Sequence, residues 1–294
     1  MLPVEILRQI RRLHLRARRA VEDLLGGEYH SVFKGTGLSF EEVREYQPGD
    51  DVRSIDWNVT ARMGSPFIKR YVEERELTLL LVVDVSGSQD FGTLRQSKRS
   101  VVAELAALLS FAAIHNNDRV GLIAFSDQIE EFLPPHKGAK HALRLIRDIL
   151  FHEPKHTGTS LICALDYLQK VQHKRAIVFL MSDFLDQGYE RLLRLAARRH
   201  DLILVRVTDT RETELPAIGL VQLEDAETGG QYLVHMSNGA FRRQFQAQVR
   251  QRQEELRRLA RGASLDLIEV GTDGTHLDSL VRFFQQRERR QRRT

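Results

Sequence analysis

Five oxygen-bearing side chains stand where apolar segments of the sequence end or where a helix is expected to begin. They are Asp84, Ser86, Ser88, Thr159 and Asp183. Carboxylates and hydroxyl groups are hard oxygen donors, the ligands that Mg²⁺ or Mn²⁺ prefers in proteins. Because Gly87 permits a tight turn, the side chains at 84, 86 and 88 can converge on one point. Too few carboxylates are present to neutralise the ion and close its shell, so we expect one position to stay open for an external oxygen, such as a partner's Asp or Glu.

The elements that must position these residues have the pattern of an α/β protein. Residues 77–85 (LTLLLVVDV) form a continuous apolar run, which is typical of a central parallel strand covered on both faces. Further strands are expected at residues 119–125, 129–133, 176–181, 202–207, 219–223, 231–235 and 265–270, and helices at residues 97–117, 138–151, 160–171, 188–199, 241–261 and 277–286. This alternation predicts βαβ units and a doubly wound, mainly parallel sheet. Ligands bind outside the carboxyl ends of the strands of such sheets, where Asp84 and Asp183 are expected to lie.

Four segments are expected along the chain. They are an N-terminal amphipathic helix at 1–27 with an arginine-rich polar face, an irregular arm of short strands and turns at 28–76, the sheet domain at 77–286 and a basic tail at 287–294. We interpret the N-terminal helix as packing against the main domain, with a partner helix or an anionic surface as the alternative. We interpret the tail as solvated, with RNA, DNA or an acidic partner as the alternative.

Composition narrows the class of protein. Cys163 is the only cysteine, so no intramolecular disulfide can form, and a lone thiol fits a reducing compartment. We find no uninterrupted apolar stretch of the kind that a secretory signal or a spanning helix needs, and therefore expect a cytoplasmic protein without a transmembrane segment. The net charge of +4 is mildly basic, which is not the profile of a dedicated nucleic-acid binder.

The pattern Asp84-x-Ser86-x-Ser88, followed by Thr159 and Asp183, resembles the metal-ion-dependent adhesion site of von Willebrand factor A domains. The resemblance implies that Asp84, Ser86 and Ser88 bind the metal directly or through water. It also implies that Thr159 is a direct ligand in some states and that Asp183 acts mostly through water. The alternative is that Asp84 caps the next helix while the serines satisfy loop amides.

A second resemblance covers residues 31–76. Its signature is Gly35-x-Gly37-x-x-Phe40-x-x-x-Arg44-x-Tyr46-x-x-Gly49-Asp50-Asp51-x-Arg53-x-Ile55-Asp56-Trp57, followed by Thr60-Ala61-Arg62. Together with the domain behind it, this stretch is similar to a bacterial domain-of-unknown-function family, number fifty-eight. Members of that family are often encoded beside MoxR-type AAA+ ATPases, which implies an adaptor or co-chaperone role.

The charged residues of this signature are expected to form a paired lattice around the apolar ring of Trp57. They are Asp50, Asp51, Arg53, Asp56 and Arg62. We interpret the lattice as stapling the arm to the sheet domain. The alternative is that part of it, notably Arg53, Asp56, Trp57 and Arg62, is a docking surface for a partner.

The sequence therefore predicts a metal-dependent protein-interaction module rather than an enzyme, with a MoxR-type ATPase or its client as the partner. A metal-dependent phosphoester hydrolase is one alternative, although no general base or phosphate-binding arginine stands beside the motif. Nucleic-acid binding through the basic helix at 241–261 and the tail is another. The phosphate-loop and dinucleotide fingerprints are absent, and Pro154 interrupts the zinc-like spacing of His152 and His156.

Overall fold

The computed structural model describes residues 39–72, 76–93, 96–156, 158–224 and 229–291. The N-terminal helix predicted at 1–27 lies outside these residues. The described chain falls into two compact units, one within Phe33–Leu77 and the other containing the residues from Thr78 onward. No helix in the described ranges is long and apolar enough to cross a membrane.

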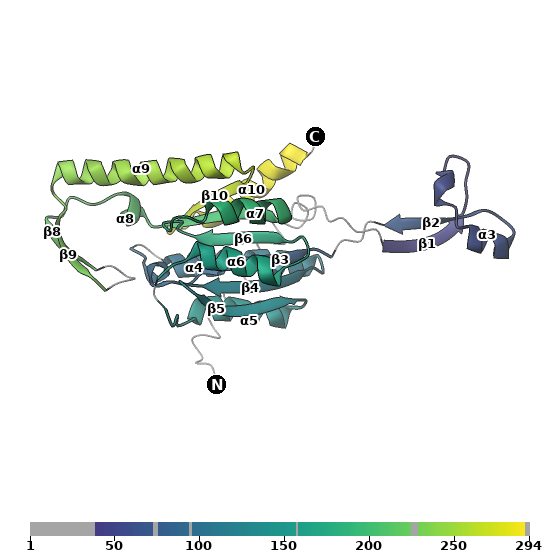
Figure 1. Cartoon of the computed structure of the whole chain (residues 1–294), viewed down its shortest axis with the longest axis horizontal. Helices are drawn as coiled ribbons and strands as arrows, with labels where there is room; N and C mark the ends of the chain where they lie inside the picture. The colour runs from purple at the N-terminus through teal and green to yellow at the C-terminus, as the bar shows by residue number, and fades with distance from the viewer. Residues whose placement is uncertain (1–38, 73–75, 94–95, 157, 225–228, 292–294) are drawn as a thin grey trace. The chain divides into compact units, whose positions relative to one another are not determined.

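A six-stranded mixed sheet forms the centre of the larger unit (Figure 1). Its strands are β3 (Thr78–Asp84), β4 (Arg119–Phe125), β5 (Ile129–His136), β6 (Ile177–Ser182), β7 (Asp201–Thr208) and β10 (Asp266–Gly271). The strand order is β10-β7-β6-β3-β4-β5. Neighbouring strands are parallel except β5, which pairs antiparallel with β4 at one edge. The α/β class predicted from the sequence is therefore confirmed.

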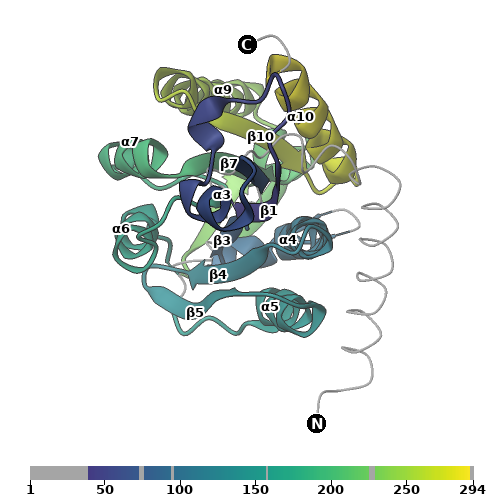
Figure 2. The ribbon, with the colours of Figure 1, turned by 90° about the vertical axis from the view of Figure 1, so that its right-hand side faces the viewer.

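Helices flank both faces of this sheet, as Figure 2 shows. One face carries α4 (Lys98–His115), α5 (Ala139–Phe151) and α10 (His276–Gln291), and the other carries α6 (Leu161–Val171), α7 (Glu190–Arg199) and α9 (Gly239–Gly262). Double coverage explains why β3 has a continuous apolar sequence: the five side chains from Leu79 to Val83 are completely buried. The core thus holds the end of β3, and Asp84 with it, in a fixed position.

Three smaller elements complete the larger unit. The short helix α8 (Thr210–Thr213) follows β7, and β8 (Leu220–Glu224) pairs antiparallel with β9 (Gln231–His235). Both strands lie where the sequence predicts strands, at residues 219–223 and 231–235.

Residues 287–291 of the predicted basic tail belong to a helix, whereas residues 292–294 lie outside the described part of the chain. Helix α10 continues to Gln291. Arg287 forms ion pairs with Asp201 and Asp266, and Arg290 pairs with Asp266 at 2.8 Å. These carboxylates at the start of β7 and β10 give the arginines partners on the domain, so the helix extends beyond its expected end.

The smaller unit contains a two-stranded sheet and a short helix. Strand β1 (Ser39–Glu45) pairs antiparallel with β2 (Phe67–Val72), and a 3-10 helix, η2 (Val52–Ser54), lies between them with α3 (Trp57–Met63). Helix α3 is not predicted by the sequence reading. Asp56 caps its start by accepting hydrogen bonds from the backbone N–H groups of Asn58 and Val59, and Gly64 ends it with a φ of 77°.

The carboxylates of this unit accept hydrogen bonds from nearby backbone N–H groups, and one of them forms an ion pair with an arginine. Asp50 pairs with Arg44 at 2.7 Å, and Asp51 accepts a hydrogen bond from the backbone N–H of Arg53. The Trp57 side chain is 68% exposed. Within the described part of the chain, the guanidinium groups of Arg53 and Arg62 form no ion pair. Trp57 is therefore not enclosed by the side chains of its own unit, and its expected roles as an anchor of the arm and in docking stay predictions.

Candidate functional site

The central strand β3 marks the place where the strand order of the sheet reverses. The chain passes from β3 to β4 on one side, and later returns to β6 on the other side of β3. Because α4 follows β3 on one face and α7 follows β6 on the opposite face (Figure 2), the loops after these two strands diverge. The carboxyl ends of β3 and β6, beside this reversal of strand order, are the position where open α/β sheets place their ligands.

The loop after β3 turns back on itself at Asp84. The backbone N–H of Ser86 donates a hydrogen bond of 3.0 Å to Oδ1 of Asp84, which makes an Asx turn. A 3-10 helix, η3 (Gly87–Asp90), begins directly after Ser86. The turn brings the Ser86 and Ser88 hydroxyl oxygens to 3.1 Å from each other. Local hydrogen bonding thus produces the convergence that the sequence predicts for these three residues.

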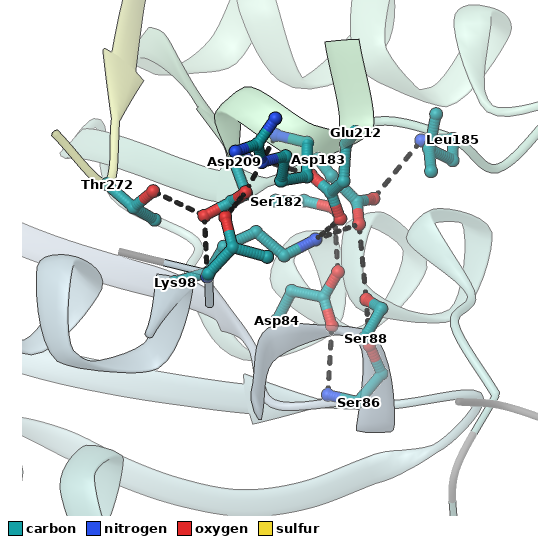
Figure 3. A network of polar contacts seen from close by, with 12 residues as sticks. Asp84, Ser86, Ser88, Lys98, Ser182, Asp183, Leu185, Asp209, Glu212 and Thr272 are labelled. Carbon is teal, nitrogen blue, oxygen red and sulfur yellow. Dashed lines mark hydrogen bonds and ion pairs between the residues drawn. The ribbon is translucent and has the colours of Figure 1, made fainter. Parts of the chain in front are cut away.

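The loop after β6 completes the cluster (Figure 3). The Ser182 hydroxyl donates to Oδ2 of Asp84 at 2.7 Å, and the Ser88 hydroxyl donates to Oδ2 of Asp183 at 3.1 Å. Asp183 also accepts a hydrogen bond from the backbone N–H of Leu185 through its other oxygen. Hydrogen bonds therefore join Asp84, Ser86, Ser88 and Asp183 into one polar cluster, although Asp84 and Asp183 are distant in sequence.

Thr159 lies in the loop before α6, and its side chain is half-buried. The next residue, Ser160, donates its backbone N–H to the carbonyl of Ser126, which follows β4. Since β4 is the neighbour of β3, this hydrogen bond places the loop at the same carboxyl edge of the sheet. The role of Thr159 as a metal ligand stays a prediction.

Lys98, at the start of α4, brings a buried positive charge into the cluster (Figure 3). Its side chain is completely buried, and its ammonium group lies 3.1 Å from Oδ2 of Asp183 and 2.7 Å from Oε1 of Glu212. Burial alone lowers the pKa of a lysine, but the charges of Asp183 and Glu212 outweigh it and raise the pKa of Lys98 above its usual value. Lys98 is therefore charged and holds these two carboxylates together.

Asp209 fixes the neighbouring loops. It accepts hydrogen bonds from the backbone N–H and hydroxyl of Thr93 at 3.1 and 2.5 Å and from the hydroxyl of Thr272 at 2.5 Å. With Glu212, Asp209 also forms the capping box of α8. Burial raises the pKa of a carboxyl group, but hydrogen bonds from Thr272, Thr93 and the backbone N–H of Arg211 outweigh it and hold the pKa of Asp209 below its ordinary value. Asp209 thus positions Glu212 to meet Lys98.

Asp84 differs from Asp183 because no described residue supplies it with a positive charge. Its side chain is 2% exposed, its contacts are the hydrogen bonds from Ser86 and Ser182, and it forms no ion pair with any other described residue. Burial, followed by the charge of Asp183, raises the pKa of Asp84 from 3.8 to about 6, although the hydrogen bonds oppose the shift. A buried carboxylate without a cation is unfavourable, so the site attracts positive charge.

The candidate metal ligands at the end of β3 are a mixture of carboxylates and neutral hydroxyl groups. Among the residues that the structure describes, no group of three or more His, Cys, Asp and Glu side chains that could hold a metal ion occurs. At the end of β3, the Ser88 hydroxyl instead links the Asp183 carboxylate to the Ser86 hydroxyl, and Asp84 accepts a hydrogen bond from the backbone N–H of Ser86. Oxygen-only sets of this kind suit hard divalent cations.

Four residues of the cluster were not among the site residues expected from the sequence: Lys98, Ser182, Asp209 and Glu212. Two signals could have found three of them. The spacing Asp209-x-x-Glu212 is readable as a capping box. Lys98 occupies the first position of a helix, where the helix dipole disfavours a cation, so a lysine there indicates a nearby carboxylate.

Fold and site together define an α/β protein with a charged polar cluster at the carboxyl ends of its central strands. The family model described as "Protein of unknown function DUF58" matches residues 42–255. The chain belongs to this family, which confirms the family identified from its sequence signature.

Several other proteins are similar to this chain. An uncharacterized protein from Mycobacterium tuberculosis is 33% identical over 283 residues, covering 95% of this chain and 89% of the relative. The protein YeaD from Bacillus subtilis is 23% identical over 167 residues, covering 57% of this chain and 40% of the relative. Among solved structures, an aerotolerance-related membrane protein from Bacteroides fragilis is 15% identical with a TM-score of 0.49, covering 73% of this chain and 99% of that chain. The protein BatB from Bacteroides thetaiotaomicron is 13% identical with a TM-score of 0.45, covering 72% and 99%.

The raised pKa of Asp84 predicts a pH-dependent gain in stability for Asp84→Asn when divalent ions are absent. Because the folded state binds the proton more tightly than the unfolded state, ionisation of Asp84 lowers the free energy of unfolding. This penalty is absent well below the ordinary pKa of 3.8 and complete above about 6. We expect the variant to be more stable than wild type by roughly 3 kcal/mol at about pH 8, and by about half as much near pH 5.

Urea unfolding of both proteins in a chelator measures this difference. A gain that is the same at both pH values, or a variant less stable than wild type at the higher pH, contradicts the electrostatic account of Asp84.

Removal of the Lys98 ammonium group leaves the carboxylates of Asp183 and Glu212 facing each other without a cation. We expect Lys98→Met to lower the free energy of unfolding by about 3–5 kcal/mol, the range for breaking a buried ion pair. Lys170→Met is the matched control, because Lys170 is exposed and, among the described residues, pairs only with Asp166 on its own helix. The control is expected within about 0.5 kcal/mol of wild type. A loss for Lys98→Met no larger than that of the control contradicts the buried pairing.

Proposed function

We propose that this protein is a metal-dependent protein-interaction module. Its Mg²⁺ or Mn²⁺ ion is held by Asp84, Ser86, Ser88, Thr159 and Asp183. The observation that carries the proposal is the buried carboxylate of Asp84, which has no cationic partner in the described chain and adjoins a set of hydroxyl and carboxylate oxygens. A divalent ion supplies the missing charge.

The spacing of the oxygens supports this assignment. Oxygens that share an octahedral magnesium ion at 2.0–2.1 Å lie about 2.9 Å from each other. The Ser86 and Ser88 hydroxyl oxygens are 3.1 Å apart, and the Ser88 hydroxyl is 3.1 Å from Oδ2 of Asp183. These separations leave little rearrangement for the side chains when they bind an ion.

The charges around the cluster support a metal ion whose coordination shell the protein does not complete. Lys98 already shares its single positive charge between Asp183 and Glu212. Asp84 is therefore the carboxylate of the cluster whose negative charge is not balanced by a described residue. One strong anionic ligand and several neutral hydroxyls leave room for a further oxygen. When bound, the ion supplies a Lewis-acidic position for a carboxylate oxygen of the partner.

The resemblance to von Willebrand factor A domains also supports a metal-dependent interaction module, because the fold has features in common with that class. The mixed sheet has its single antiparallel strand, β5, at one edge, and helices cover both faces. We propose that the larger unit is a doubly wound domain of this type and that Asp84 to Ser88 is its adhesion motif. The family resemblance further supports a MoxR-type AAA+ ATPase, or its client, as the partner, with this chain acting as an adaptor.

Calorimetric titration with Mg²⁺ and Mn²⁺ tests the metal site. We expect saturable binding to wild type and none to Asp84→Asn, because the variant keeps the shape of Asp84 but removes its charge. Asp166→Asn is the matched control, because Asp166 is an exposed residue of α6. It is expected to bind the ions as wild type does.

The stability difference between the free and ion-loaded proteins gives a second readout. Ion binding raises the unfolding temperature of wild type and of Asp166→Asn, but not that of Asp84→Asn. Binding of equal affinity by Asp84→Asn and wild type contradicts the assignment of Asp84 as a ligand.

Partner capture tests the interaction itself. We expect immobilised wild-type protein to retain the MoxR-type ATPase of the same organism in Mg²⁺ and to release it in a chelator. Asp84→Ala is expected to lose capture while keeping its fold by circular dichroism, and Asp166→Ala to retain it. Capture that persists both in chelator and in Asp84→Ala contradicts a metal-bridged interaction with this partner.

A further inference from the structure

A second surface of the larger unit lies far along the sheet from β3, at the edge strand β10. Within the described part of the chain, β10 pairs with β7 on one side and with no strand on the other. Figure 2 shows β10 between α9 and α10 at this end of the sheet. A groove of about 600 Å³ runs here, lined by residues of β10 and of both helices.

The free side of β10 offers backbone groups that need partners. An edge strand presents a row of N–H and C=O groups, and an extended peptide can pair with them as an additional strand. Proteins commonly protect such edges with charge or with a covering element. Here the two helices flank the edge and leave a groove above it, which is the shape that an added strand fills.

Positive charge predominates along this groove. Four arginines and two carboxylates are among its lining residues. Each of the carboxylates is already paired with two arginines. These pairs are Asp266 with Arg287 and Arg290, and Glu269 with Arg206 and Arg257. The carboxylates are therefore neutralised, and the groove keeps an excess of positive charge.

Two of the lining arginines, Arg261 of α9 and Arg282 of α10, are exposed and have no carboxylate partner among the described residues. The guanidinium group of Arg282 contacts only the carbonyl of Asp278 and the hydroxyl of Ser279, both on its own helix. One unpaired guanidinium thus stands on each wall of the groove, on either side of the strand edge.

We propose that the β10 groove binds an acidic peptide segment in extended conformation. The peptide pairs its backbone with the free edge of β10, and its carboxylates contact Arg261 and Arg282. The chain's own N-terminal residues 1–25 are a poor occupant, because they carry six arginines. Charge complementarity therefore favours a segment of another protein.

The same charge could attract a nucleic acid, but the lining of the groove favours a peptide. Single-stranded nucleic acids gain affinity by stacking bases on exposed aromatic rings. The aromatic ring that lines the groove, Phe283, is buried and lies beneath the guanidinium group of Arg287 at 5.9 Å. A strand edge with unpaired amides is instead complementary to another peptide backbone.

Fluorescence anisotropy tests the proposal with a labelled peptide of about nine residues in which Glu and Val alternate. The titration is done in chelator, so that it is independent of the metal site. We expect saturable binding to wild type and to Asp84→Asn, and about tenfold weaker binding to the double variant Arg261→Glu/Arg282→Glu. Arg243→Glu/Arg250→Glu is the matched control, because both arginines are exposed on α9 but do not line this groove.

Two further probes separate strand pairing from charge alone. The same peptide with alternate backbone nitrogens methylated keeps its charge but loses its pairing edge, and we expect it to bind at least about tenfold more weakly. Binding of the unmodified peptide is also expected to slow hydrogen exchange at the amides of β10.

The proposal is overturned if the two double variants lose the same affinity, or if the methylated peptide binds as well as the unmodified one. It is also overturned if a single-stranded oligonucleotide of equal net charge binds more tightly than the peptide and loses that affinity in Arg261→Glu/Arg282→Glu. That result would assign the groove to nucleic acid.

Discussion

The burial of the Asp84 carboxylate at the end of the central strand is the constraint around which the site is built. Asp84 ends a strand in which the side chains from Leu79 to Val83 are completely buried, so its carboxylate cannot turn away into solvent. Asp183 lies close enough to oppose its ionisation. The loop after β3 donates the backbone N–H of Ser86 to Asp84, and the Ser182 hydroxyl at the end of β6 donates a second hydrogen bond. The shape of both loops follows from satisfying this one side chain.

The second carboxylate is satisfied in a different way, which links the site to the rest of the domain. Asp183 receives the ammonium group of Lys98, and Lys98 is shared with Glu212 of α8. Glu212 is held by the capping box of Asp209, whose other hydrogen bonds come from the loops after η3 and β10. Four loops of the carboxyl edge are thereby connected through buried charge. A change of charge at the cluster therefore alters the ion pairs or hydrogen bonds that hold each of these loops.

The parts of the fold that could be read from the sequence are those governed by local pattern. The apolar runs at β3, β4 and β6 identified buried strands because a doubly covered strand has no polar face. The convergence of Asp84, Ser86 and Ser88 was predictable because a single Asx turn produces it. The approach of Asp183 followed from a general rule about strand ends.

The parts that could not be read depend on distant partners or on short elements. Lys98 is an ordinary helix residue until the chain folds and brings Asp183 and Glu212 against it. Helix α3 has only seven residues, too few for an apolar period, and is defined by its caps at Asp56 and Gly64. The extension of α10 depends on Asp201 and Asp266, which precede it by many residues in the chain. For Lys98 and for the end of α10, the missing information is a contact between distant segments, which the helix or strand propensity of one segment does not reveal.

The shared ammonium group of Lys98 also constrains how the protein can change over evolutionary time. Replacement of Lys98 alone leaves the buried Asp183 and the partly buried Glu212 without a cation, whereas neutralisation of both acids leaves a buried base. Each single step crosses a state with uncompensated charge inside the domain. The three positions can drift only as a correlated group, with compensating replacements arriving together or in close succession. We expect replacements at the three positions to be correlated among members of this family, independently of any ligand.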